Sequence, residues 1–198
     1  MKIEKDEKVK AAIIDAAAMV FQKWGLNKST MEDIARAAGK GKSSLYYYYK
    51  SKEDIFYTVM VQSIGELIAT SRSKVEAETS AGNKLRVYLA TLLDEVKKIA
   101  ALYDIVRGEI SEKPDLISRI RAEFDTQEVQ LISELIRLGI TNGEFRTFDE
   151  MDIEAIASVI TCATRSLLMD LYIENIFAFN SDRVHILIDL LFNGIKNS

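Results

Sequence analysis

The stretch from residue 29 to residue 54 constrains the fold more than any other part of this 198-residue chain. It opens with two overlapping capping boxes, Ser29 with Glu32 and Thr30 with Asp33, and either pair would start the same helix. Apolar residues then recur at helical spacing, namely Met31, Ile34, Ala35 and Ala38. The pattern predicts a short amphipathic helix.

A glycine-lysine-glycine turn at residues 39–41 ends this helix, because glycine takes a positive φ at little cost. A second helix is predicted from Lys42 to Tyr49, and Ser51 with Asp54 can cap a third. Two short helices joined by a tight turn form the helix-turn-helix arrangement that reads DNA.

Four consecutive tyrosines, residues 46–49, indicate what the second helix contacts. Successive helical residues lie about 100° apart, so the four rings sweep roughly 300° and cannot all face one core. Leu45 and Tyr49 are expected to pack inward, which leaves Tyr47 and Tyr48 outward beside Lys42, Ser43 and Ser44. Ammonium and hydroxyl groups of this kind bond phosphates and base edges. The alternative is an ordinary solvated helix face that happens to carry aromatic residues.

The same residues resemble the DNA-binding domain of the TetR family of transcriptional regulators. The resemblance rests on Thr30-Met-Glu-Asp-Ile-Ala-Arg-Ala-Ala-Gly39, on Lys42-Ser-Ser-Leu-Tyr-Tyr-Tyr-Tyr-Lys-Ser-Lys-Glu53, and on Phe21, Trp24 and Gly25 upstream. It covers about a quarter of the chain. Lys40, Gly41 and Tyr49 depart from the commonest residues of the motif, which leaves the family assignment intact but the base contacts open.

The resemblance implies which residues touch DNA. By position in the motif, the major-groove residues are expected to be Lys42, Ser43, Ser44, Tyr47 and Tyr48. Phosphate contacts are expected from Thr30, Tyr46 and Lys52, with Lys40 and Lys50 as weaker candidates.

Charge is divided unevenly along the chain, in agreement with a DNA-binding head. Residues 1–52 carry 11 Lys and Arg against 6 Asp and Glu, whereas the rest carry 15 against 24. A basic head on an acidic body suits a protein whose N-terminal part alone meets DNA. The single cysteine and the absence of a signal peptide or an apolar run of membrane-spanning length predict a cytoplasmic protein.

Few prolines and glycines and long apolar stripes predict an all-α fold of about nine helices. Residues 1–52 are expected to form the three-helix DNA-binding domain, and residues 53–198 a helical effector-binding and dimerisation domain. The last two predicted helices, 150–174 and 182–194, are apolar over more than one face. In the TetR family such helices form a dimer interface, so a homodimer on a double-stranded operator is expected.

The resemblance further implies a repressor that a small molecule releases from DNA. Polar residues on apolar helices are the candidate effector contacts: Tyr88, Tyr103, Arg107, Thr161, Cys162 and Arg165. For each of them a place at the edge of the core, on the surface or in an ion pair is the simpler interpretation.

An enzyme is not expected, and neither a metal nor a cofactor is. His185 is the only histidine, and no nucleophile motif, Cys/His cluster or glycine-rich phosphate loop accompanies it. The remaining alternative is a helical dimeric module that binds a ligand or a protein without regulating transcription. Such a module would not need the basic, aromatic face of residues 42–52.

Overall fold

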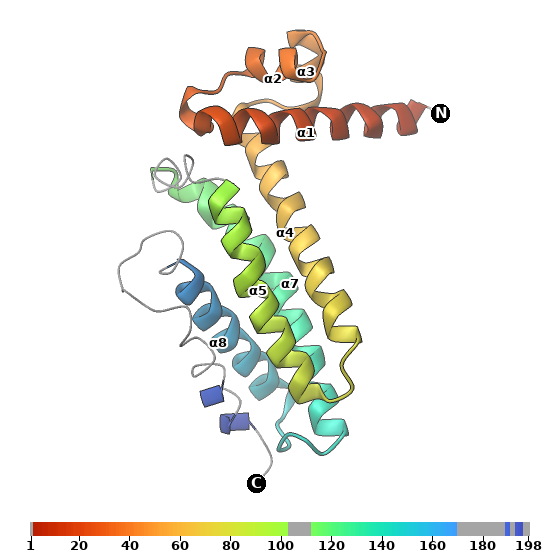
Figure 1. Ribbon diagram of the computed structural model, residues 1–198, viewed down its shortest axis with the longest axis vertical. Helices are drawn as coiled ribbons and strands as arrows, with labels where there is room; N and C mark the ends of the chain where they lie inside the picture. The colour runs from red at the N-terminus through yellow and green to blue at the C-terminus, as the bar shows by residue number, and fades with distance from the viewer. Residues whose placement is uncertain (1, 103–111, 170–188, 191–192, 196–198) are drawn as a thin grey trace. The chain divides into compact units, whose positions relative to one another are not determined.

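The computed structural model describes residues 2–102, 112–169, 189–190 and 193–195, and its labelled elements are all helices (Figure 1). They are α1 (Lys2–Lys28), α2 (Met31–Ala37), α3 (Lys42–Tyr48), α4 (Lys52–Glu76), α5 (Ala81–Leu102), α7 (Pro114–Thr141) and α8 (Glu150–Met169). The predicted all-α fold with an N-terminal helix-turn-helix is confirmed. Within the described residues, none of the helices is long and apolar enough to cross a membrane.

The chain folds as two compact units, which we call unit 1 (residues 1–64 and 99–121) and unit 2 (residues 65–98 and 122–198). Helices α4, α5 and α7 each contribute residues to both units. The domain boundary predicted after residue 52 falls in the first turn of α4.

Local signals fix the beginning and end of the helices in unit 1. Thr30, rather than Ser29, caps α2: its hydroxyl accepts the Asp33 N–H at 3.1 Å, and the Asp33 carboxylate accepts the Thr30 N–H at 3.1 Å. Gly39 closes α2 with a φ of 64°, while the Lys40 N–H donates to the Ala35 carbonyl at 2.9 Å. Gly25, with a φ of 76°, interrupts α1 three residues before its end.

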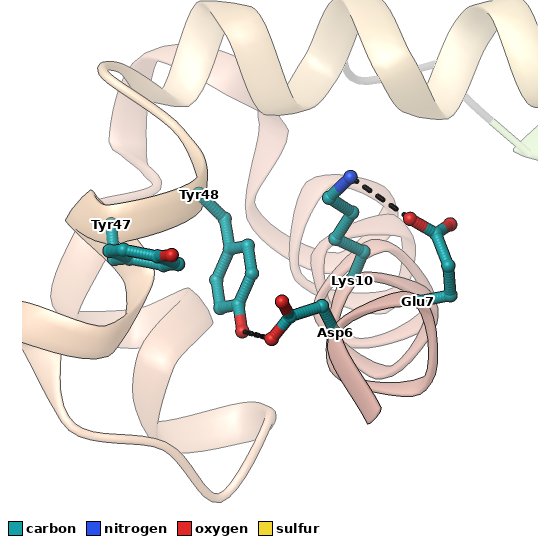
Figure 2. A pocket seen from close by; sticks show the side chains of 5 residues that line it. All are labelled: Asp6, Glu7, Lys10, Tyr47 and Tyr48. Carbon is teal, nitrogen blue, oxygen red and sulfur yellow. Dashed lines mark hydrogen bonds and ion pairs between the residues drawn. The ribbon is translucent and has the colours of Figure 1, made fainter. Parts of the chain in front are cut away.

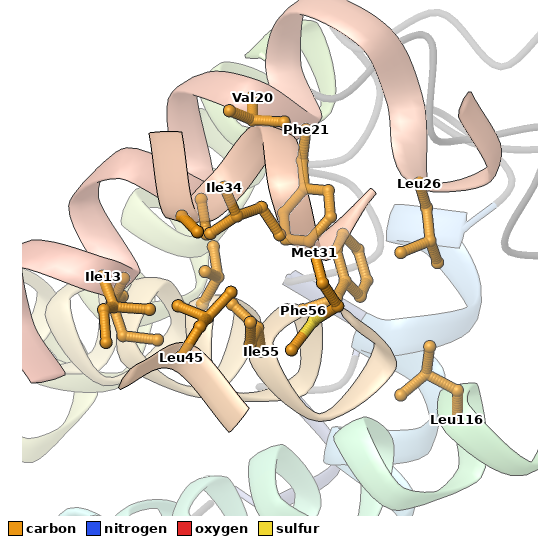
Figure 3. Packing of buried hydrophobic residues seen from close by; sticks show 14 residues of the cluster. Ile13, Val20, Phe21, Leu26, Met31, Ile34, Leu45, Ile55, Phe56 and Leu116 are labelled. Carbon is orange, nitrogen blue, oxygen red and sulfur yellow. The ribbon is translucent and has the colours of Figure 1, made fainter. Parts of the chain in front are cut away.

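A cluster of buried apolar side chains holds unit 1 together (Figure 3). Leu45 of α3 is fully buried in it, as its position four residues from Tyr49 predicts. Phe21 of α1 meets Phe56 of α4 edge to face, with ring centroids 5.3 Å apart. Leu116 of α7 joins the same cluster, so the DNA-binding unit includes a segment more than fifty residues beyond its helix-turn-helix.

Unit 2 is built on α5, α7 and α8, with the second half of α4 (Figure 1). Its buried apolar residues are Leu67, Ile68, Val75, Ala81, Leu85, Leu89, Leu92, Leu131, Ile132, Leu135, Ile136, Phe145, Ile153, Ala157, Ile160 and Ile195. Residues 114–141, whose continuity the sequence leaves open, form one unbroken helix. At its end, Gly139 lies against the ring of Phe145, where a methyl group would overlap that ring.

The loop between α7 and α8 caps another helix of unit 2. The Glu144 carboxylate accepts the N–H groups of Ala81 at 2.8 Å and Gly82 at 3.0 Å, the first residues of α5. Burial opposes ionisation of Glu144, but these two backbone donors outweigh it, and the net result is a lowered pKa. A carboxylate at a helix N-terminus also interacts favourably with the helix dipole.

Candidate DNA-binding interface

Helix α3 presents one polar, aromatic face to solvent. Tyr47 is 74% exposed and Tyr46 is 47% exposed, and Lys42 and Ser43 are exposed as well. Because Leu45 anchors the opposite side of this short helix, its orientation is fixed by unit 1's core. The structure therefore brings most of the predicted major-groove residues together on one accessible surface, with Ser44 half-buried beside them.

Tyr48 departs from the prediction that it points freely outward. Its ring is half-buried, and its hydroxyl donates to the Asp6 carboxylate of α1 at 2.9 Å (Figure 2). The Asp6 hydrogen bond, then burial, raises the pKa of Tyr48. Tyr47 packs edge to face on the same ring, with centroids 4.9 Å apart. Tyr48 thus supports Tyr47 from behind while α1 holds its hydroxyl.

An open recess of about 470 Å³ lies between α1 and α3. Figure 2 shows its lining, formed by Asp6, Glu7, Lys10, Tyr47 and Tyr48. Lys10 and Glu7 form an ion pair across 3.1 Å at its edge. No local sequence pattern points to Asp6, because its partner Tyr48 lies 42 residues away.

Lys52, predicted to bind a phosphate, makes three bonds inside the protein. Its ammonium donates to the carbonyls of Leu26 at 2.7 Å, Asn27 at 2.9 Å and Ser29 at 3.0 Å. A lysine has three N–H donors, so all of them are used. This placement argues against the predicted phosphate contact: Lys52 ties the α1–α2 turn to the start of α4.

The remaining predicted phosphate contacts are exposed. Lys40 and Lys50 form no ion pair with any residue that the structure describes. Lys42 is paired with Glu32, whose hydrogen bond raises the pKa of the lysine. Thr30 uses its hydroxyl in the capping box of α2. Among the lysines between residues 40 and 52, Lys40 and Lys50 are therefore those whose ammonium groups are available to bind a phosphate.

The predicted effector residues divide into three groups. Tyr103 and Arg107 lie outside the described residues. Tyr88 and Thr161 are buried in unit 2. Cys162 is exposed on α8, and Arg165 pairs with Asp125 of α7 while one of its N–H groups lies 3.4 Å from the Cys162 sulfur.

Sequence reasoning missed Glu128, which is fully buried in α7. A signal was present: Glu128 precedes Leu131 and Ile132 by three and four residues, so it lies on the apolar stripe of a helix. Burial, reinforced by Asp125, raises its pKa to about 8 against the opposing effect of Arg165. No cluster of metal-ligating side chains occurs among the described residues.

The helix-turn-helix fold and the accessible face of α3 define a DNA-binding protein of the helix-turn-helix class. Residues 13–59 match the family described as "Bacterial regulatory proteins, tetR family". Residues 13–59 therefore form a DNA-binding domain of the TetR type, which makes the chain a DNA-binding transcriptional regulator similar to the proteins of that family.

Comparisons over most of the chain agree with this assignment. The chain is 25% identical over 167 residues to the nucleoid occlusion factor SlmA of Haemophilus influenzae, spanning 83% of this chain and 75% of that protein. It is 25% identical over 146 residues to the HTH-type transcriptional repressor KstR2 of Rhodococcus jostii, spanning 72% and 69%. The fold resembles that of the transcriptional regulator FadR from Bacillus subtilis in complex with stearoyl-CoA, with a TM-score of 0.68, 20% identity and coverage of 93% and 98%.

Proposed function

We propose that this protein is a dimeric repressor that binds a two-fold operator through α3 and leaves it when unit 2 binds a small molecule. The observation that carries the proposal is the exposed face of α3, where Lys42, Ser43, Tyr46 and Tyr47 stand clear of the core. A similar protein is named a repressor, and a structure of similar fold holds stearoyl-CoA, which supports repression and effector binding.

Residues 1–52 are proposed as the DNA-reading part and residues 53–198 as the effector and dimerisation part. Tyr47 and Ser43 are assigned to base edges, with Ser44 and Lys42 beside them. Tyr46, Lys40 and Lys50 are assigned to phosphates, because they are exposed. Tyr48 and Lys52 are assigned positioning roles, since Asp6 and three carbonyls respectively already hold them.

The outer face of α8 supports dimerisation. Ile153, Ala157 and Ile160 turn inward, whereas Met151 and Val159 are 82% and 61% exposed. Ala155, Ser158 and Cys162 are exposed too, so one stripe of the outer face, flanked by the exposed Asp152 and Glu154, carries apolar and small residues that permit close helix packing between two copies. A change of Val159→Asp is expected to shift the sedimentation of the protein from dimer to monomer, while Met19→Asp on α1, also an exposed apolar site, leaves it unchanged.

Fluorescence anisotropy with duplexes from the DNA flanking its coding region tests the DNA role. We expect sequence-selective binding that weakens as salt increases, because phosphate contacts release counterions. Tyr47→Ala should reduce affinity for the preferred duplex about 10- to 100-fold while leaving non-specific binding nearly unchanged. Trp24→Ala, which removes a half-exposed aromatic residue from α1, is the matched control.

A folded dimer that binds no duplex at low salt would contradict the proposal. That result would favour the helical module that binds a ligand or a protein without regulating transcription.

A further inference from the structure

Unit 2 buries a carboxylate that receives no hydrogen bond. Glu128 on α7 is 0% exposed, and both of its carboxylate oxygens lack a partner among the described residues. The same holds for the hydroxyl of Tyr88 on α5, which is 0% exposed, and for that of Thr161 on α8, which is 1% exposed. Buried polar groups are nearly always satisfied in folded proteins, so three such groups together call for a missing partner.

These groups belong to one neighbourhood. Tyr88 and Glu128 interact electrostatically, and the negative charge near Tyr88 adds to burial in raising the pKa of its phenol. Arg165 interacts with Glu128 and pairs with Asp125, which lies one turn before Glu128 on α7. Thr161 lies one turn before Arg165 on α8. Helices α5 and α7 therefore bring unsatisfied oxygen atoms into one region, and α8 contributes Arg165 to it and carries the buried, unpartnered hydroxyl of Thr161 one turn from Arg165.

The charges of this neighbourhood do not balance. Asp125 and Glu128 are two carboxylates, and Arg165 is the guanidinium that pairs with one of them. The second oxygen of Asp125 is buried and unpartnered as well. Arg72, the next cation near Tyr88, already faces Glu134 at 3.8 Å. Among the residues that the structure describes, one negative charge is left over, and in the free protein a proton on Glu128 neutralises it, in line with its pKa of about 8.

We propose that Glu128, Tyr88 and Thr161 bind the cationic head of an amphiphilic amine, which is the effector of this regulator. A primary ammonium has three N–H donors, and the carboxylate of Glu128 and the hydroxyls of Tyr88 and Thr161 are unsatisfied acceptors. Its positive charge replaces the proton of Glu128, which passes to solvent. Leu92 and Ile132, both fully buried one turn beyond Tyr88 and Glu128, provide apolar surface for the hydrocarbon part. The inference rests on the proposed effector function of unit 2.

The same cluster disfavours an anionic effector. A carboxylate or phosphate placed here would face Asp125 and Glu128 with only Arg165 between them, and Arg165 is already engaged. The expected ligand class therefore differs from that of the stearoyl-CoA held by the FadR structure of similar fold.

Calorimetric titration of the full-length protein with decylammonium, decanol and decanoate, all below their micelle-forming concentrations, tests the proposal. The three probes share one hydrocarbon chain and differ in the charge of the head. Decylammonium should bind most tightly, and Glu128→Gln should weaken it about 10- to 100-fold, since hydrogen bonds to charged groups are the strong ones. Glu154→Gln, at an exposed glutamate of α8, should leave the affinity unchanged.

Two further readouts separate a direct contact from a structural effect. In buffers of different ionisation enthalpy at pH 7, the wild-type protein should release about one proton per bound decylammonium and Glu128→Gln none. Tyr88→Phe keeps the buried ring and removes only an unpartnered hydroxyl, so the fold should persist while the affinity falls several-fold.

Equal binding of decanol or decanoate, an unchanged affinity of Glu128→Gln, or no binding of decylammonium would each overturn the amine site. Release of operator DNA is measured separately with decylammonium and with decanoyl-CoA. Release by decanoyl-CoA alone would uphold the proposed repressor and reject the amine. Binding of decylammonium through Glu128 with no loss of DNA affinity would uphold the site and reject its role as effector.

Discussion

Replacing Glu128 with glutamine should change how the stability of the protein depends on pH. Glu128 is fully buried, and its pKa rises from the usual 4.5 to about 8 in the folded protein. Between these two values the folded state holds a proton that the unfolded state has lost. The free energy of unfolding therefore falls as pH rises from 4.5 to 8, by up to about 1.4 kcal/mol per pH unit.

The loss of stability between pH 4.5 and pH 8 can be calculated from the two pKa values of Glu128. At pH 5 both Glu128 and the glutamine variant are neutral, so their stabilities should be similar. By pH 7.5 the wild-type protein has lost about 3 kcal/mol that Glu128→Gln, which never ionises, retains. The stabilising contribution is thus complete below pH 4.5 and lost by about pH 8.

Urea denaturation at half-unit steps from pH 5 to pH 8 measures the difference, with Glu154→Gln as the exposed control. The difference between wild type and Glu128→Gln should widen with pH, whereas Glu154→Gln should follow the wild type. Parallel curves for wild type and Glu128→Gln would show that Glu128 ionises normally and would refute the charge argument.

Three other substitutions test the structure. Lys52→Met should lower the free energy of unfolding by about 2 kcal/mol, because it removes three hydrogen bonds to backbone carbonyls. The salt dependence of DNA binding should not change. A decrease of about one in the slope of log affinity against log salt concentration would instead support the phosphate contact predicted for Lys52. Gly139→Ala should lower the free energy of unfolding by about 1 to 3 kcal/mol, because the added methyl group overlaps the ring of Phe145. Gly65→Ala, at an open position in the middle of α4, should slightly stabilise the protein. A lower melting temperature for Gly65→Ala than for Gly139→Ala would contradict this packing. Glu144→Gln should lower the free energy of unfolding by about 1 kcal/mol at pH 7, because the carboxylate caps α5. Since the pKa of Glu144 is lowered in the folded protein, this difference should disappear as the pH falls below 4.5 and the carboxylate is protonated. Urea denaturation at pH 7 and at a pH below 4.5 measures the difference.

The helix-turn-helix could be predicted from the sequence because local signals decide it. The Thr30 capping box, the glycine at residue 39 and the inward face of Leu45 all depend on residues within a few positions of one another. Of the two N-caps that the sequence left open for α2, Thr30 and Ser29, the structure shows Thr30. Such features can be predicted because they depend on residues close together in the sequence, and the family resemblance covers the same stretch.

Contacts between distant residues could not be predicted. Asp6 reaches Tyr48 across 42 positions, and Lys52 reaches Leu26 across 26, so a residue that looks free in the sequence is engaged in the fold. Glu128 shows the opposite failure: its place on the apolar stripe of α7 indicates burial, but glutamate is normally exposed, so the residue type argues against it. The residues least predictable in this chain are those whose polar groups depend on other helices.

Helix α7 would give the proposed effector of unit 2 a covalent connection to unit 1. This single helix carries Leu116, a member of the apolar cluster of unit 1, and Glu128, which is buried in unit 2. Because close-packed cores are bistable rather than continuously deformable, a displacement of α7 by a ligand must be taken up as a change of packing around Leu116. Switching from 1% to 99% of the DNA-incompetent form requires an effector preference of about 10⁴-fold.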